Sequence, residues 1–148
     1  MKPLMLRGVA LFKGYLGPGE QLDMVETIRK VAQAAPFYHP VTPGGRKMSV
    51  RMTSAGAFGW VTDRRGYRYE PRHPDGMDWP PIPVEVMAIW DDVAPGARAP
   101  ECCLVNYYGE GARMGLHQDH DEADFSQPVV SVSLGDAGLF RIGNVGSI

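Results

Sequence analysis

The order of the predicted elements indicates an α+β fold in a single domain, and three observations predict it. The chain of 148 residues, with 44% hydrophobic and 22% charged residues, has the composition of one globular domain. Helical periodicity is confined to the first two thirds of the chain. Short apolar runs separated by Gly, Asp or Pro fill the last third, which is typical of a sandwich or jelly roll growing at the C-terminal end.

Two helices are expected. In the first, apolar residues recur at spacings of three and four and form one face, which consists of Leu22, Val25, Ile28, Ala32 and Ala35. Pro36 ends this helix, which we expect to pack against a sheet. The second and shorter helix is marked by Val86, Ile89, Trp90 and Val93.

The expected strands are short. Residues 9–12 form the first, residues 47–52 alternate polar and apolar as a half-buried strand does, and residues 57–61 form its returning partner. Residues 71–83 contain five prolines and predict an irregular loop. The strands expected in the last third are 102–107, 112–118, 129–134 and 139–142.

Several function classes are excluded by simple features. No run of about 18 apolar residues exists, so we expect no membrane span. The first seven residues lack the apolar core of a secretory signal, so a cytoplasmic protein is expected. Cys102 and Cys103 are adjacent, and we expect both to be free thiols.

Positive charge is concentrated in one short region. Residues 46–72 carry seven basic and two acidic residues, whereas residues 73–148 carry three basic and twelve acidic residues. Within the basic region, residues 64–69 interleave arginines with tyrosines, a pattern suited to phosphates and to unstacked bases. The region indicates a local anionic ligand, and the alternative is a solvated surface of mixed charge.

Residues of metal-binding type occur at a suitable spacing near residue 117. His117 and Asp119 project from the same face of an extended chain, as two ligands of one Fe(II) ion must. Such a pair also arises by chance, and His73 with Asp75 is a second example that lies in a predicted turn. Asn106 also shares a face with the residue two positions later, Tyr108, and both can donate hydrogen bonds to an oxyanion; the alternative is partly exposed strand residues.

The motifs in their order resemble the AlkB family of Fe(II)- and 2-oxoglutarate-dependent dioxygenases, which repair alkylated nucleic-acid bases. The matching segments are Asn106-x-Tyr108, residues 116–122 and 128–135, and upstream residues 41–45, 48–53, 59–60 and 65–67. The resemblance implies one domain over residues 1–148, a double-stranded β-helix (jelly roll) with N-terminal helices. It also implies a nucleotide-recognition lid at about 41–80 and the start of the jelly-roll core at about 101–148.

The resemblance further implies oxidative dealkylation of N-alkylated bases in DNA or RNA, with Fe(II), O2 and 2-oxoglutarate. His117 and Asp119 match two of the three iron ligands, and Asn106 and Tyr108 match residues that hold 2-oxoglutarate. The implied partner is nucleic acid, either single-stranded or with a flipped alkylated base, and no obligate protein partner is inferred. Contacts to substrate are implied for the lid aromatics Trp60, Tyr67 and Tyr69, for Met52 against the alkylated base, for Asp121 near the base edge, and for Thr42 at the nucleotide backbone.

The sequence departs from the family pattern after residue 120. No His follows that position, although the family places its third ligand on a later strand, and Arg141 lies too early to match the family's downstream Arg. We therefore expect a chain that is incomplete at its C-terminus, with the closing strands missing. Two alternatives to a dealkylase stay open: a catalytically inactive truncated homologue that binds nucleic acid, and an oxygenase with a protein or small-molecule substrate.

Overall fold

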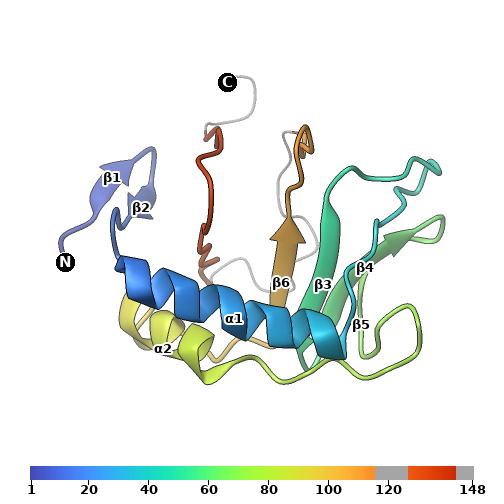
Figure 1. Cartoon of the computed structure of the whole chain (residues 1–148), viewed down its shortest axis with the longest axis horizontal. Helices are drawn as coiled ribbons and strands as arrows, with labels where there is room; N and C mark the ends of the chain where they lie inside the picture. Colours follow the sequence, from blue (N-terminus) through green and yellow to red (C-terminus); the bar gives the residue numbers. More distant parts are fainter. Residues whose placement is uncertain (116–126, 143–148) are drawn as a thin grey trace.

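The computed structural model describes residues 1–115 and 127–142, and Figure 1 shows their arrangement. In this part of the chain, six strands form three antiparallel pairs: β1 with β2, β3 with β6, and β4 with β5. Both helices lie on one side of the strands, and β3 and β6 stand over α1 (Figure 1). The elements are β1 Leu4–Leu6, β2 Val9–Leu11, α1 Pro18–Ala34, β3 Arg51–Gly56, β4 Gly59–Asp63, β5 Gly66–Glu70, α2 Val84–Val93 and β6 Cys102–Tyr107.

Helix α1 buries or half-buries most of the predicted face, together with two residues that were not predicted. Its N-terminus has Pro18 in the first turn, and the carboxylate of Glu20 accepts a hydrogen bond from the backbone N–H of Gly17 at 3.1 Å. The buried positions of the helix are Met24 and Val31, whereas Leu22 is 71% exposed. The predicted apolar stripe was therefore wrong at its first member, because several alternative stripes exist in a helix with apolar residues on more than one side.

Strand β3 begins later than predicted and has another partner. The strand expected at 57–61 occurs as β4, but its pairing with the strand expected at 47–52 was wrong, because β3 pairs with β6 and places Thr53 opposite Val105. The chain turns away after β3, since the backbone N–H of Gly56 donates to the carbonyl of Pro80 at 2.7 Å. Strand β4 instead pairs with β5, a strand that was not predicted.

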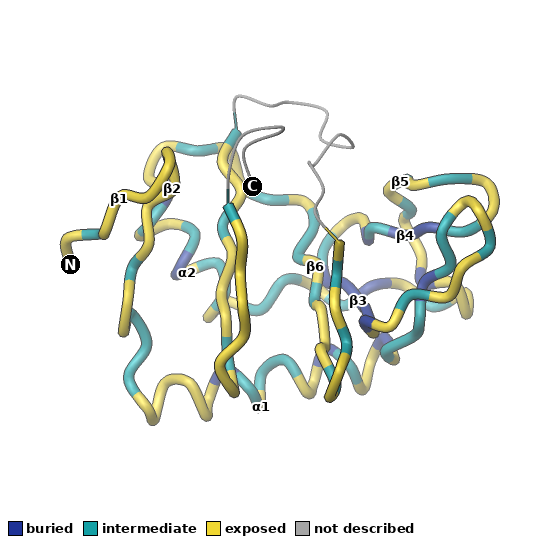
Figure 2. Tube along the Cα trace, turned by 90° about the horizontal axis from the view of Figure 1, so that it is seen from above, coloured by how far each residue is buried: buried dark blue, intermediate teal, exposed yellow. Residues whose placement is uncertain are grey.

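The core lies where the end of α1 meets the strands. Ala35, Val61 and Trp79 form a buried cluster, and Tyr38 packs against it. Figure 2 shows the buried positions concentrated along β3 and β4. The hydroxyl of Thr53 ties α1 to β3, because it donates to the carbonyl of Ala35 at 2.6 Å and both residues are fully buried.

The C-terminal segment differs most from the prediction. Residues 127–142 lie between the β1–β2 hairpin and β6 in Figures 1 and 2, but they contain no paired strand, so the strands expected at 129–134 and 139–142 were wrong. Residues 112–115 are not a strand either, and the rest of that prediction lies outside the described residues. An apolar run is suited to a buried strand, but a strand forms only where a partner strand is available. Leu139 and Phe140 are 84% and 78% exposed, so this segment is not covered by such a partner in the described part of the chain.

Other predictions are confirmed. The second helix, the strand at 102–107 and the irregular chain at 71–83 all occur as expected, and Cys102 and Cys103 form no disulfide. The described residues thus form an α+β structure with two helices and short sheets, without a closed jelly roll. Neither helix is long and apolar enough to cross a membrane.

Candidate functional site

One face of the β3–β6 pair brings together two of the predicted site residues, and a third follows just beyond the pair. Met52 of β3 lies directly opposite Asn106 of β6, and directly opposed residues in an antiparallel pair share a face. Tyr108 follows Asn106 by two positions just beyond the end of β6. Met52 is buried, whereas Asn106 is exposed and Tyr108 is 54% exposed, so an apolar side chain adjoins two accessible polar ones.

The β4–β5 hairpin carries the three predicted lid aromatics. Trp60 is paired with Tyr69 and Thr62 with Tyr67, so all four side chains share one face of the hairpin. The rings of Trp60 and Tyr67 are stacked, with centroids 5.5 Å apart and planes 23° apart. Because Trp60 is half-buried and Tyr67 is 49% exposed, the pair forms a partly exposed aromatic surface, hereafter the Trp60–Tyr67 platform.

The other face of the hairpin carries an ion-pair network. The guanidinium of Arg68 donates to both carboxylate oxygens of Asp63, each at 2.9 Å, and to Glu70 Oε1 at 2.5 Å. These bonds hold the pKa of the Asp63 carboxyl well below its usual range and raise the pKa of the Arg68 guanidinium. Arg68 is therefore already paired within the chain, and this network was missed in the sequence analysis.

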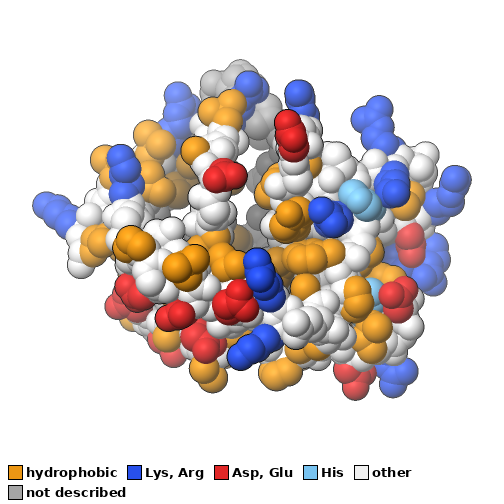
Figure 3. Space-filling view, viewed as in Figure 1, with side chains coloured by type: hydrophobic (Ala, Val, Ile, Leu, Met, Phe, Trp, Pro, Cys, Tyr) orange, Lys and Arg blue, Asp and Glu red, His pale blue; other side chains and the backbone are white. Residues whose placement is uncertain are grey.

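Other basic side chains lie around the end of the molecule that holds the hairpin (Figure 3). Figure 3 shows Lys and Arg side chains around the end of the molecule that holds β4 and β5, and Asp and Glu side chains gathered over the helices. Arg65 is 79% exposed and makes a 3.5 Å ion pair with Asp63, and no ion pair of Arg64 occurs within the described ranges. The local positive surface predicted for residues 46–72 thus remains, without the contribution of Arg68.

Thr42 lies in a tight turn near this positive surface. Its side-chain oxygen accepts a hydrogen bond from the backbone N–H of Arg46 at 3.2 Å, and its carbonyl accepts one from Gly45 at 2.8 Å. The hydroxyl hydrogen is still available to a further acceptor. The turn therefore orients Thr42 without consuming its donor.

Tyr38 links the two groups of site residues and was not singled out from the sequence. Its backbone exchanges hydrogen bonds with Met52 at 3.0 and 2.8 Å, on the opposite side of β3 from Asn106. Its hydroxyl donates to the carbonyl of Trp60 at 3.3 Å, and burial raises the pKa of the Tyr38 phenol to about 12. One residue thus connects the strand of Met52 with the strand of the platform.

His117 and Asp119, and the substrate contact Asp121, lie outside the described residues. Within residues 1–115 and 127–142, no three His, Cys, Asp or Glu side chains gather as a metal site.

His73 has a structural role, as the turn prediction implied. It is 3% exposed, its Nδ1 accepts a hydrogen bond from the backbone N–H of Asp75 at 3.0 Å, and its Nε2 lies 2.7 Å from the carbonyl oxygen of Pro36. Nε2 must then carry the proton and donate. Both ring nitrogens are occupied, so His73 does not offer a replacement ligand.

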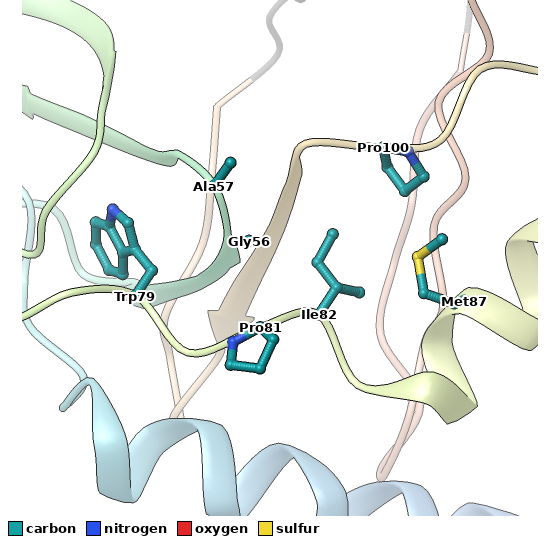
Figure 4. Close-up of a pocket in the computed structure, with 7 residues that line it drawn as sticks. All are labelled: Gly56, Ala57, Trp79, Pro81, Ile82, Met87 and Pro100. Carbon is teal, nitrogen blue, oxygen red and sulfur yellow. The ribbon is translucent and has the colours of Figure 1, made fainter.

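A separate hollow lies at the other end of β3 (Figure 4). It has a volume of about 470 Å³ and lies between the end of β3, the chain around Trp79 and Pro81, and Met87 of α2. Its lining is mainly apolar and includes none of the predicted site residues. The hollow is therefore not the candidate site.

The chain matches a known family over most of its length. Residues 8–146 match the 2OG-Fe(II) oxygenase superfamily. This match defines the class of protein, a class whose members use Fe(II) and 2-oxoglutarate.

Individual relatives narrow the class. The chain is 47% identical, over 97% of its length and 66% of the relative's, to the "Alpha-ketoglutarate-dependent dioxygenase AlkB homolog" of Caulobacter vibrioides. It is 30% identical, over 92% of its length and 35% of the relative's, to the "DNA N(6)-methyladenine demethylase ALKBH1D" of Arabidopsis thaliana. The solved structure of OsALKBH1 superimposes with a TM-score of 0.64 at 28% identity, over 81% of this chain and 61% of that one. The chain belongs to the AlkB family of the 2OG-Fe(II) oxygenases.

The donor groups present suit the cofactors of this family. An imidazole and a carboxylate two positions apart, as in His117 and Asp119, are the ligand types found in non-haem Fe(II) sites. Asn106, on the face that Met52 shares, and Tyr108, just beyond β6, supply two accessible neutral hydrogen-bond donors, which suits the carboxylates of 2-oxoglutarate.

Proposed function

We propose that the protein oxidatively dealkylates N-alkylated bases in DNA or RNA, using Fe(II), O2 and 2-oxoglutarate. The observation that carries the proposal is the Trp60–Tyr67 platform, which is partly exposed, lies in a region rich in arginine and is joined through Tyr38 to the strand of Met52. Aromatic surfaces bordered by cations are a general device for binding unstacked bases and their phosphates. The name of one relative, a DNA N(6)-methyladenine demethylase, supports the same substrate class.

In this proposal, four residues hold the iron and the co-substrate. His117 and Asp119 bind Fe(II), which supplies the oxidising chemistry with O2 and 2-oxoglutarate when bound. Asn106 and Tyr108 donate hydrogen bonds to 2-oxoglutarate from the β6 side. The neutral donors add no charge, so they orient the co-substrate without competing with the metal for it.

The substrate is held by other residues of the same proposal. A flipped base stacks on Trp60 and Tyr67, since an enzyme that acts on a base must take it out of the duplex or use a single strand. Tyr69 lies beside Trp60 on the same face of the hairpin and extends the contact. Met52 gives an apolar contact to the alkyl group, and the Asp121 carboxylate favours a cationic N-methylated base over a neutral one by Coulomb attraction.

The nucleotide backbone is held at the positive surface. Arg64 and Arg65 lie in the turn between β4 and β5 and attract phosphates, and the Thr42 hydroxyl donates to the backbone. These contacts position the strand without reading its sequence.

A nucleic-acid-binding module without turnover is the second candidate function. The observation that favours it is that the Trp60–Tyr67 platform and the exposed arginines of the hairpin, which are all that such a module needs, lie within the described residues. Such a module would use the same platform and arginines, so binding alone does not separate the two functions.

Formaldehyde release separates them. The chain is loaded with Fe(II) and 2-oxoglutarate and given single-stranded DNA that contains one N-methylated adenine. We expect formaldehyde from the wild-type chain and none from His117→Ala, with DNA binding unchanged in that variant. Binding by both chains without formaldehyde from either would reject the dealkylase and support the module.

A further inference from the structure

The network of Arg68 occupies the face of the hairpin that the platform does not use. Arg68 lies opposite Val61, whereas Tyr67 and Tyr69 lie on the alternate face of β5. Its guanidinium bridges from β5 to Asp63, the last residue of β4, and binds both oxygens of that carboxylate. A third contact, from Nε to Glu70 Oε1, fixes the guanidinium from the other side.

Because of these contacts, the Arg68 guanidinium is poorly placed to bind a phosphate from outside the chain. Two carboxylates neutralise its charge, and its side chain is 26% exposed, whereas that of Arg65 is 79% exposed. Arg68 Nη1 also donates to the carbonyl of Gly66 at 3.1 Å, within the turn itself. The residue is thus committed to contacts inside the hairpin.

The stacked pair on the other face depends on the geometry of the hairpin. Trp60 and Tyr67 are diagonal neighbours, because Trp60 is paired with Tyr69 and Tyr67 with Thr62. Diagonal side chains meet only at a particular strand twist, and an isolated two-stranded hairpin is marginally stable. A rigid, bidentate bridge across the hairpin fixes that twist, because the planar guanidinium allows one orientation of the Asp63 carboxylate.

We propose that Arg68 is a positioning residue, whose fork to Asp63 and contact to Glu70 hold β4 and β5 so that Trp60 and Tyr67 form one stacked surface for a base. In its functional part, this inference rests on the proposed function, since it assigns the platform to nucleic-acid binding. It also divides the arginines of the hairpin by role: Arg64 and Arg65 face phosphates, and Arg68 shapes the surface on which the base stacks.

Two substitutions at Arg68 separate its charge from its geometry. Arg68→Lys keeps one positive charge but loses the fork, and Arg68→Gln loses both. Arg64→Gln is the matched control, because it removes one charge from the same hairpin, and no ion pair of Arg64 occurs in the described part of the chain. Tyr67→Leu supplies the reference spectrum for an unstacked Trp60.

The first measurement is the near-UV circular dichroism of each chain without nucleic acid, with far-UV spectra to verify that each variant folds. We expect both Arg68 variants to move toward the Tyr67→Leu spectrum and Arg64→Gln to match the wild type. Glu70→Ala removes only the Nε contact and gives an intermediate change, which keeps the test decisive if an Arg68 variant fails to fold. Wild-type spectra for the Arg68 and Glu70 variants would overturn the proposal.

The second measurement is fluorescence anisotropy with a labelled single-stranded thymidine oligonucleotide at several KCl concentrations. We expect both Arg68 variants to bind at least about fivefold more weakly, the loss of one base–aromatic stack, with an unchanged salt slope. Arg64→Gln lowers the salt slope by about 0.7. Wild-type affinity in Arg68→Lys, together with a reduced salt slope in Arg68→Gln, would instead show that Arg68 contacts a phosphate and would overturn the proposal. Absence of wild-type binding would reject the proposed function, while the spectra would still decide the positioning of the platform.

Discussion

Gly59 is the position where one added methyl group should disturb the base of the hairpin most. A Cβ atom at this position would lie 2.1 Å from Cε2 and 2.2 Å from Cζ2 of Trp79. The backbone of Gly59 is not in the left-handed region, so the substitution Gly59→Ala is opposed by this contact alone. Trp79 is 6% exposed and belongs to the buried cluster with Ala35 and Val61.

The indole cannot move away without further loss. Its Nε1 donates to the carbonyl of Glu70 at 2.9 Å, and its ring packs edge-on against His73 with centroids 5.2 Å apart. Overpacking of a core costs about 1–3 kcal/mol, and loss of the hydrogen bond adds about 1 kcal/mol. We therefore expect Gly59→Ala to lower the free energy of unfolding by about 2–4 kcal/mol.

Urea unfolding followed by tryptophan fluorescence measures this loss. Gly44→Ala is the control, because an added Cβ there meets nothing within 4 Å and its backbone is not left-handed, so a change within about 0.5 kcal/mol is expected. The cost of Gly59→Ala should shrink in a Trp79→Leu background, since the clashing indole atoms are then absent. A Gly59→Ala chain as stable as the wild type, or an equal cost in both backgrounds, would refute the packing of Trp79 on β4.

Three further predictions follow from buried or paired groups. His73→Leu should lower the free energy of unfolding by about 2–3 kcal/mol in urea and leave Fe(II) affinity unchanged; weaker Fe(II) binding would instead indicate a ligand. Because Arg68 depresses the pKa of Asp63 in the folded chain, the stabilisation from this pair is present above the ordinary carboxyl pKa of 3.8 and is lost as the pH falls below it. The free energy of unfolding measured in urea should thus fall between about pH 6 and about pH 2 in the wild type and fall much less in Asp63→Asn; an equal loss of stability in the two chains would contradict the assignment. Thr53→Val should cost about 1–3 kcal/mol in urea, because the buried carbonyl of Ala35 loses its 2.6 Å hydrogen bond, and a neutral result would show that the carbonyl finds another donor.

The parts of the fold that the sequence predicts well are those with a strong local cause. The prolines between residues 71 and 83 prevent regular structure, and the apolar spacing around Ile89 leads to α2. The strand expected at 102–107 also occurs and carries Asn106, whereas Tyr108 lies just beyond its end, so the shared face of these two residues stays a prediction.

Strand pairing was not predictable from local pattern. β3 joins β6, a strand 46 residues later by the pairing of Gly56 with Cys102, because long-range contacts and the bonds of Gly56 to Pro80 decide the partner. The ion pairs of Arg68 were not predicted for a related reason. The composition shows only that a cation is present, whereas the register of the hairpin decides whether a carboxylate lies beside it. The nearby Asp63 and Glu70 are the sequence features that could have predicted these ion pairs, but only once the register of β4 and β5 is known.

The most direct test of the account is the effect of the two groups of site residues on the Michaelis constants for formaldehyde release. In the proposed function, Asn106 binds 2-oxoglutarate and Tyr67 binds the base. We therefore expect Asn106→Leu to raise the KM for 2-oxoglutarate and to leave the KM for the methylated oligonucleotide unchanged, and we expect Tyr67→Ala to have the reverse effect. A reaction indifferent to both substitutions, or no formaldehyde from the wild-type chain, would contradict the account.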